Sequence, residues 1–161
     1  MHLLVDNTQK HLELNLCNLK DLVYSVLKNE NSSSDEVSIH FCSSQQISIL
    51  HADFFNDPSS TDCISFPIDE PRAKSSGKDY HVLGEIFVNP QAALLYASNK
   101  GSCPYEELSL YVVHGLLHLL GYDDIEPKDR KLMRQAEQEN MNIIKTLNLL
   151  ILPQSKQIVN A

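Results

Sequence analysis

The segment spanning residues 104–124 constrains the fold of this chain more than any other. Pro104 suits the first turn of a helix, Glu106 and Glu107 favour its positive N-terminal end, and Gly121 is a common helix stop. The pattern between these signals predicts a strong helix, and any fold of the chain must accommodate it. Its apolar positions include Leu108, Val112 and Leu119.

Two histidines, His114 and His118, lie four residues apart on this predicted helix. Residues at this spacing share one helix face and sit about 6 Å apart along the axis, so their imidazoles can converge on one ion. After Gly121 the chain can turn back and bring a third group toward the same ion. Asp124, six residues beyond His118, occupies that position.

Two imidazoles and one carboxylate leave a coordination position open for water, which is typical of catalytic rather than structural zinc. The ion would make that water a nucleophile near neutral pH, so the pattern predicts hydrolysis, with His114 as a catalytic metal ligand. No residue is predicted to act as a general base. The alternative is that both histidines are only polar positions of a helix, because pairs at this spacing are common.

Gly115 argues against a peptidase. The peptidase pattern H-E-x-x-H requires a glutamate as general base directly after the first histidine, and this chain has glycine there. Glycine inside a helix costs about 1 kcal/mol relative to alanine. We therefore expect a neighbouring helix or a substrate to approach the backbone closely at this position.

Other segments predict a mixture of strands and helices. Apolar patterns predict strands at residues 2–5, 37–41, 63–66 and 82–88. Helical patterns cover residues 12–27, 44–55 and 91–100, and a long amphipathic helix begins at Pro127. The apolar stripe of that last helix is predicted at Leu132, Ala136, Ile143 and Leu147. A polar loop at residues 67–81 is too long for a simple connection, which indicates mobility or function.

Length and composition predict one domain over residues 1–152 with a flexible tail at 153–161. The four cysteines form no C-x-x-C pair, so neither a disulfide framework nor a sulfur zinc site is indicated. No secretory or membrane-spanning pattern is found, and we expect a cytoplasmic protein without a membrane partner. The net charge of −8 argues against strong non-specific nucleic-acid binding, so any RNA function must rest on a local site.

Residues 114–124, HGLLHLLGYDD, resemble the H-G-x-L-H-L-x-G-Y-D-H signature of the YbeY family of metal-dependent endoribonucleases. Residues 61–67, TDCISFP, resemble the T-D-V-L-S-F-P strand of the family, and residues 83–86, LGEI, resemble its L-G-D-I strand. These segments occur in the family's order. The resemblance extends to about Ile144.

The resemblance implies a single-domain α+β fold in which about five helices pack a small mixed four-stranded sheet and one zincin-like helix carries the metal ligands. It also implies one zinc ion per chain, held by His114, His118 and Asp124. The implied activity is cleavage of single-stranded RNA in ribosomal RNA maturation, at the 3′ end of 16S RNA, and in ribosome quality control. A ribosome or ribosomal protein is the implied partner.

Two positions depart from the family pattern. Asp124 stands where the family usually has histidine, and an anionic ligand makes a bound water less acidic and widens the choice of metal, although two imidazoles still favour zinc. By alignment, Phe55 stands where the family usually has an arginine that would hold a phosphate. Basic residues of the polar loop could supply that cation and contact RNA, unless the loop is simply solvated. They are Arg72, Lys74 and Lys78.

Three further residues are candidates for supporting roles. Asp123 matches an aspartate of the signature and is predicted to orient a ligand or to cap the following turn. Ser65 and Glu85 lie on strands that resemble family strands, and they either line the cleft or serve only the sheet. Two other functions stay open: a catalytically weakened, ribosome-associated metal-binding factor, and a metallohydrolase of peptides or small molecules.

Overall fold

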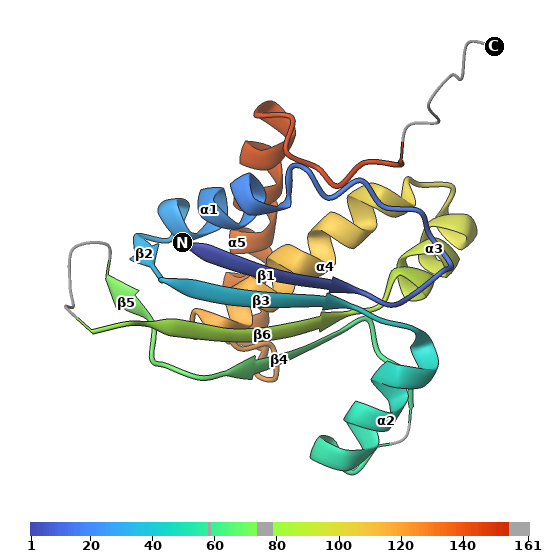
Figure 1. The fold of residues 1–161 in the computed structure, drawn as a ribbon, viewed down its shortest axis with the longest axis horizontal. Coiled ribbons are helices and arrows are strands. Elements are labelled where there is room, and N and C mark those ends of the chain that lie inside the picture. Colours follow the sequence, from blue (N-terminus) through green and yellow to red (C-terminus); the bar gives the residue numbers. More distant parts are fainter. Residues whose placement is uncertain (58, 74–78, 155–161) are drawn as a thin grey trace.

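The computed structural model describes residues 1–57, 59–73 and 79–154 and contains a mixed four-stranded sheet (Figure 1). The strands are β1 (His2–Asn7), β3 (Glu36–Phe41), β6 (Val82–Val88) and β4 (Cys63–Pro67), in that spatial order. β1 and β6 both run parallel to β3, whereas β4 runs antiparallel to β6. The four predicted strands are therefore confirmed, with small changes at their ends.

Five helices accompany this sheet: α1 (Leu19–Asn29), α2 (Ser44–Phe55), α3 (Pro90–Lys100), α4 (Pro104–Leu119) and α5 (Pro127–Thr146). α4 lies along one face of the sheet against β4 and β6, and α1, α3 and α5 pack against α4 (Figure 1). α2 stands apart at one end and packs against β4. The predicted α+β class, with one central helix that carries both motif histidines, is confirmed.

Close packing of α4 on the sheet depends on Gly115. A Cβ atom placed there would lie 2.6 Å from Cγ2 of Ile86 and 2.9 Å from Sγ of Cys63, both closer than van der Waals contact allows. The hydroxyl of Ser65 also donates a hydrogen bond to the Gly115 carbonyl oxygen at 3.0 Å. The close approach expected at this glycine is present, but strands β4 and β6 make it, rather than a helix or a substrate.

The first helix begins seven residues later than its apolar pattern predicts, at Leu19. The preceding segment packs Leu12 and Leu16 against the core without forming a helix, so the leucine spacing was misleading there. The Gln9 side chain bonds the backbone of this segment instead, accepting from the amides of His11 and Leu12 and donating to the Leu12 carbonyl. A competing local hydrogen-bond pattern of this kind holds the chain out of a helix.

The buried stripe of α5 also differs from the predicted one. Leu132 and Leu147 are about half exposed, at 49% and 56%, and the buried positions are Met133, Ala136, Asn140, Met141 and Ile144. The helix is rotated so that Asn140 faces inward, where its amide donates to a carboxylate oxygen of Glu30 at 2.9 Å. Because that polar group is fully bonded, it can occupy a core position.

The polar loop predicted at residues 67–81 is partly ordered by pairing. Arg72 and Ala73 form β5, which pairs antiparallel with β2 (Ser32–Ser33). Residues 74–78 lie outside the described part of the chain. Within the described residues, no helix is long and apolar enough to cross a membrane. The four cysteines are free thiols.

Candidate metal centre

Three ligand atoms converge at the C-terminal end of α4. Nε2 of His114 and Nε2 of His118 lie 3.1 Å apart, and one carboxylate oxygen of Asp124 lies 3.6 Å and 3.4 Å from them. Asp124 belongs to the loop between α4 and α5 and reaches back to the helix. The structure thus brings together the three residues that the spacing singled out, and their ligand atoms all fall within 4.8 Å of one another.

The opposite nitrogen of each ring is held by a hydrogen-bond acceptor. Nδ1 of His114 donates to the carboxylate of Glu137 at 2.7 Å, and Nδ1 of His118 donates to the backbone carbonyl of Tyr122 at 3.0 Å. A carbonyl or an ionised carboxylate can only accept, so each Nδ1 carries the proton of its neutral ring. When both rings are neutral, the two Nε2 atoms face each other with free lone pairs, in the orientation that metal-binding histidines usually have.

This arrangement fits a metal ion. Two nitrogen lone pairs 3.1 Å apart repel each other unless a proton or a metal cation lies between them. The carboxylate of Asp124 adds a third donor and negative charge at the same point. Two neutral nitrogens with one carboxylate oxygen form a ligand set that suits zinc and leaves a fourth tetrahedral position open.

Acidic groups around His114 shape its electrostatics. Burial by itself would lower the pKa of this imidazole, but the hydrogen bond and the charge of Glu137 outweigh that effect and raise it. Asp62 and Asp124 add to the rise. The region therefore favours a positive charge at His114, and a cation bound between the histidines would experience the same negative field.

Sequence reasoning missed Glu137. Its side chain is 19% exposed and lies on the inner side of α5, next to the buried residues Ala136 and Asn140. One signal was available in the sequence, because Glu137 is flanked by core positions of an amphipathic helix. A carboxylate at such a place is rarely left without a partner. The spacing of the two histidines cannot reveal a partner that comes from another helix.

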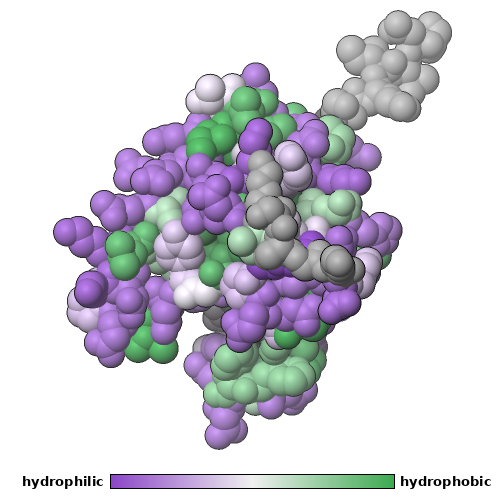
Figure 2. Space-filling view, turned by 90° about the vertical axis from the view of Figure 1, so that its left-hand side faces the viewer, coloured by the Kyte–Doolittle hydropathy of each residue, from purple (hydrophilic) through white to green (hydrophobic). Residues whose placement is uncertain are grey.

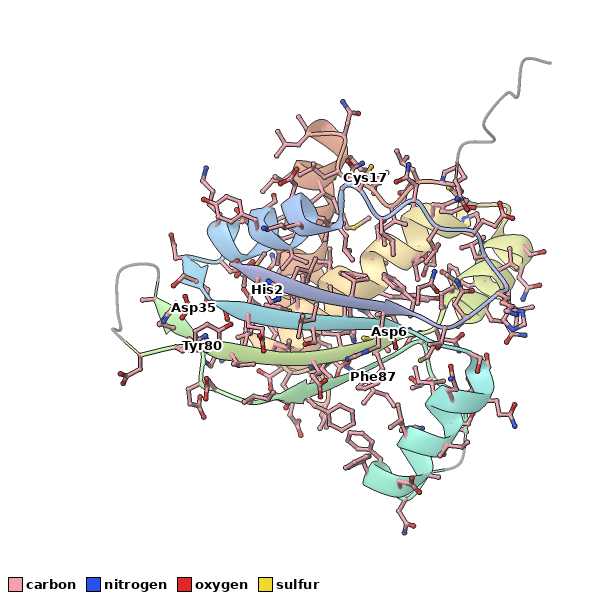
Figure 3. The ribbon with its side chains drawn as sticks, viewed as in Figure 1. His2, Asp6, Cys17, Asp35, Tyr80 and Phe87 are labelled. Carbon is pink, nitrogen blue, oxygen red and sulfur yellow. The ribbon has the colours of Figure 1, made fainter. Side chains whose placement is uncertain are left out.

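Ser65 and Glu85 lie on opposite faces of the sheet. Ser65 faces α4 and, with His118, lines a cavity of about 300 Å³. Ile86 contacts α4 near Gly115, so the pleat turns its neighbour Glu85 to the other face. There Glu85 meets the His40 ring at 3.2 Å, and that ring stacks on Phe87, which Figure 3 places on the sheet above α2.

The other predicted residues are placed as follows. Asp123 accepts hydrogen bonds from the backbone amides of Asp124 and Ile125 at 2.7 Å and 3.4 Å, which fixes the turn that carries Asp124. Arg72 forms an ion pair with Asp35 at 3.3 Å and lines a separate cavity beside β2. Asp35 lies at the opposite end of the sheet from α2 (Figure 3). Lys74 and Lys78 lie outside the described residues.

Together, the mixed sheet, the central helix with its histidine pair and the loop carboxylate define an α+β protein with a group of side chains that could hold a metal ion. The family model described as "Endoribonuclease YbeY" matches residues 4–145. The chain belongs to this family.

Individual relatives agree with the family match. The chain is 48% identical over 145 residues to a protein named Endoribonuclease YbeY from Protochlamydia amoebophila, covering 90% of this chain and 94% of that protein. It is 38% identical over 150 residues to the protein of the same name from Chlamydia felis, covering 91% and 93%. The fold is also that of TM1509 from Thermotoga maritima, known from a solution structure, with a TM-score of 0.61, 24% identity and coverage of 99% and 100%.

Proposed function

We propose that this chain is a zinc-dependent endoribonuclease that cleaves single-stranded RNA. The observation that carries the proposal is the convergence of two imidazole nitrogens and one carboxylate oxygen, with both rings locked from behind by Glu137 and the Tyr122 carbonyl. The names of the relatives at 48% and 38% identity supply the substrate class.

His114, His118 and Asp124 would hold the ion. When bound, zinc supplies a Lewis acid that polarises a phosphate and lowers the pKa of a coordinated water. The residues around it hold the ligands in place: Glu137 keeps His114 in the tautomer that offers Nε2, and Asp123 fixes the turn behind Asp124. Such pre-positioning avoids reorganisation when charge develops on the phosphate.

Ribosomal RNA is the proposed substrate, including the 3′ end of 16S RNA, with a ribosomal particle or protein presenting it. The support is the match to the signature of the family over residues 114–124. A net charge of −8 weakens sequence-independent affinity for free RNA, and this favours presentation by a partner.

A local exception to this negative charge is the exposed basic face of α5. It consists of Arg130, Lys131 and Arg134, which form no ion pair with any described residue.

Metal content and cleavage test the proposal together. Purified protein should carry one zinc ion per chain by elemental analysis and should cut a single-stranded oligoribonucleotide, with activity lost in chelator and restored by zinc. His118→Ala and Asp124→Ala should lower both metal content and cleavage. His51→Ala is the matched control for metal content, because His51 lines the same cavity as His118 but is not among the three ligands.

Two results would contradict the proposal. If the Asp124→Ala variant still carried one zinc ion per chain, the Asp124 carboxylate would not be a metal ligand. If zinc-loaded protein never cuts single-stranded RNA yet still binds ribosomal particles, the chain is a ribosome-associated factor and not a nuclease.

A further inference from the structure

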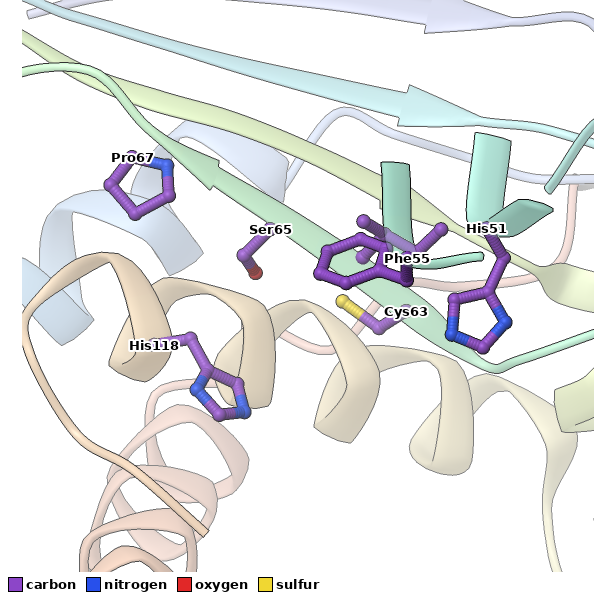
Figure 4. A pocket seen from close by; sticks show the side chains of 7 residues that line it. His51, Phe55, Cys63, Ser65, Pro67 and His118 are labelled. Carbon is purple, nitrogen blue, oxygen red and sulfur yellow. The ribbon is translucent and has the colours of Figure 1, made fainter. Parts of the chain in front are cut away.

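The cavity beside the metal centre has an aromatic wall. It is lined by seven residues, among them Phe55 on α2 and His118 on α4, with Cys63 and Ser65 of β4 beside them (Figure 4). Because His118 is one of the three converging ligands and also part of this lining, the cavity borders the proposed metal site. Its volume of about 300 Å³ lies at the lower end of the range for small-molecule sites.

The lining of this cavity contains neither lysine nor arginine among the described residues. Phosphate groups are usually held by cationic side chains, so this wall is poorly suited to the RNA backbone. It offers instead the aromatic ring of Phe55, a residue that is 53% exposed. The Phe55 ring contacts two others, with ring centroids 5.5 Å from His51 and 6.2 Å from Phe66.

The exposure of Phe55 is not an isolated feature. Phe54, next to it, is 64% exposed, and Ile47 is the buried residue of α2. Figure 2 shows apolar surface gathered on the lower lobe of the molecule, at the level where Figure 1 places α2. Large apolar side chains grouped on a surface usually mark a binding site. Phe55 differs from Phe54 in lining the cavity, whereas Phe54 lies edge-on to Phe66 at 5.0 Å.

We propose that Phe55 stacks against one unpaired base of the RNA and thereby places the neighbouring phosphate at the metal centre. This inference rests on the proposed ribonuclease function. Every base has a flat π face, so aromatic stacking binds single strands with little sequence preference. Bases in a duplex are already stacked on each other and cannot enter, so the same contact selects single-stranded RNA.

Binding of a fluorescently labelled, cleavage-resistant single-stranded oligoribonucleotide to the zinc-loaded chain tests the role of Phe55. Phe55→Leu should raise Kd by about 5- to 150-fold, which corresponds to about 1–3 kcal/mol, because leucine keeps the apolar volume but not the flat ring. Phe55→Tyr should bind within twofold of the wild type. Phe54→Leu, the matched control on the same helix, should also stay within twofold.

A scan with oligonucleotides that each lack one base identifies the partner of Phe55. One abasic position should weaken binding to the wild type and have no further effect on Phe55→Leu. The inference would be overturned if Phe55→Leu bound the oligoribonucleotide as tightly as the wild type, or if Phe55→Tyr bound it as weakly as Phe55→Leu. Either result would leave the proposed function intact as long as the wild type showed zinc-dependent cleavage. A wild-type protein that neither binds nor cuts single-stranded RNA would overturn the proposed function and this inference with it.

Discussion

Replacing Glu137 tests whether the metal centre depends on the hydrogen bond behind His114. The 2.7 Å separation of His114 Nδ1 and the Glu137 carboxylate is at the short end of charge-assisted hydrogen bonds. The Glu137 side chain is 19% exposed, so water screens this contact only in part. Partners of this kind typically contribute 10- to 100-fold to metal affinity, or about 1.4–2.8 kcal/mol.

The two substitutions at this position should differ. Glu137→Gln keeps an oxygen acceptor but loses its charge, so zinc affinity should fall by about tenfold. Glu137→Ala leaves Nδ1 of His114 without an acceptor and frees the ring to take the other tautomer, so the loss should approach 100-fold. Competition with a chromophoric zinc chelator measures both values, and circular dichroism verifies the fold of each variant.

Glu139→Gln is the matched control, because Glu139 is an exposed glutamate on the same helix and forms no contact with either histidine. It should bind zinc as tightly as the wild type. If both Glu137 variants also match the wild type within twofold, the hydrogen bond does not orient the ligand and the argument from ring tautomers is wrong.

Three further predictions concern stability and RNA binding. Gly115→Ala should lower the free energy of unfolding in urea by about 1–2 kcal/mol, since overpacking against the sheet exceeds the gain in helix propensity. The backbone amide of His81 and then the Arg72 guanidinium hold the pKa of Asp35 below its usual 3.8, so its stabilisation is present above pH 3.8 and lost as pH falls through the lower folded-state pKa. The difference in urea stability between wild type and Asp35→Asn should therefore shrink from pH 7 to pH 2. Replacing the three basic residues of the α5 face by alanine should reduce the slope of log K against log salt for single-stranded RNA by about 2; an unchanged slope would exclude that face from the RNA path. Those residues are Arg130, Lys131 and Arg134.

The sequence predicted the features that depend on local spacing. The positions of the four strands of the main sheet, the central helix and the convergence of His114, His118 and Asp124 all follow from short-range patterns, and the structure agrees with them. The start of α1 and the buried face of α5 were wrong because hydrogen bonds made by Gln9 and Asn140 decided them. Hydrophobic periodicity does not register such bonds.

Contacts between distant segments were beyond prediction for a different reason. Glu137 meets His114 only because α5 packs against α4, and Phe55 lines one cavity with His118 only because α2 packs against β4. Neither pairing leaves a spacing signal in the chain, since the partners lie on separate elements. A histidine pair thus predicts a metal site, while the groups that orient the metal ligands and shape the cavity require the assembled fold.

Gly115 shows how the fold limits the chemistry of the site. A peptidase of the H-E-x-x-H type would need glutamate at this position, yet even the Cβ atom of such a residue would lie 2.6 Å from Ile86 Cγ2. Glutamate could enter only if the Ile86 and Cys63 side chains or helix α4 itself shifted, and a shift of α4 would disturb the hydrogen bond from Ser65 to the Gly115 carbonyl and move both histidines. The packing that sets the two ligands beside the sheet therefore disfavours the peptidase base at its usual place.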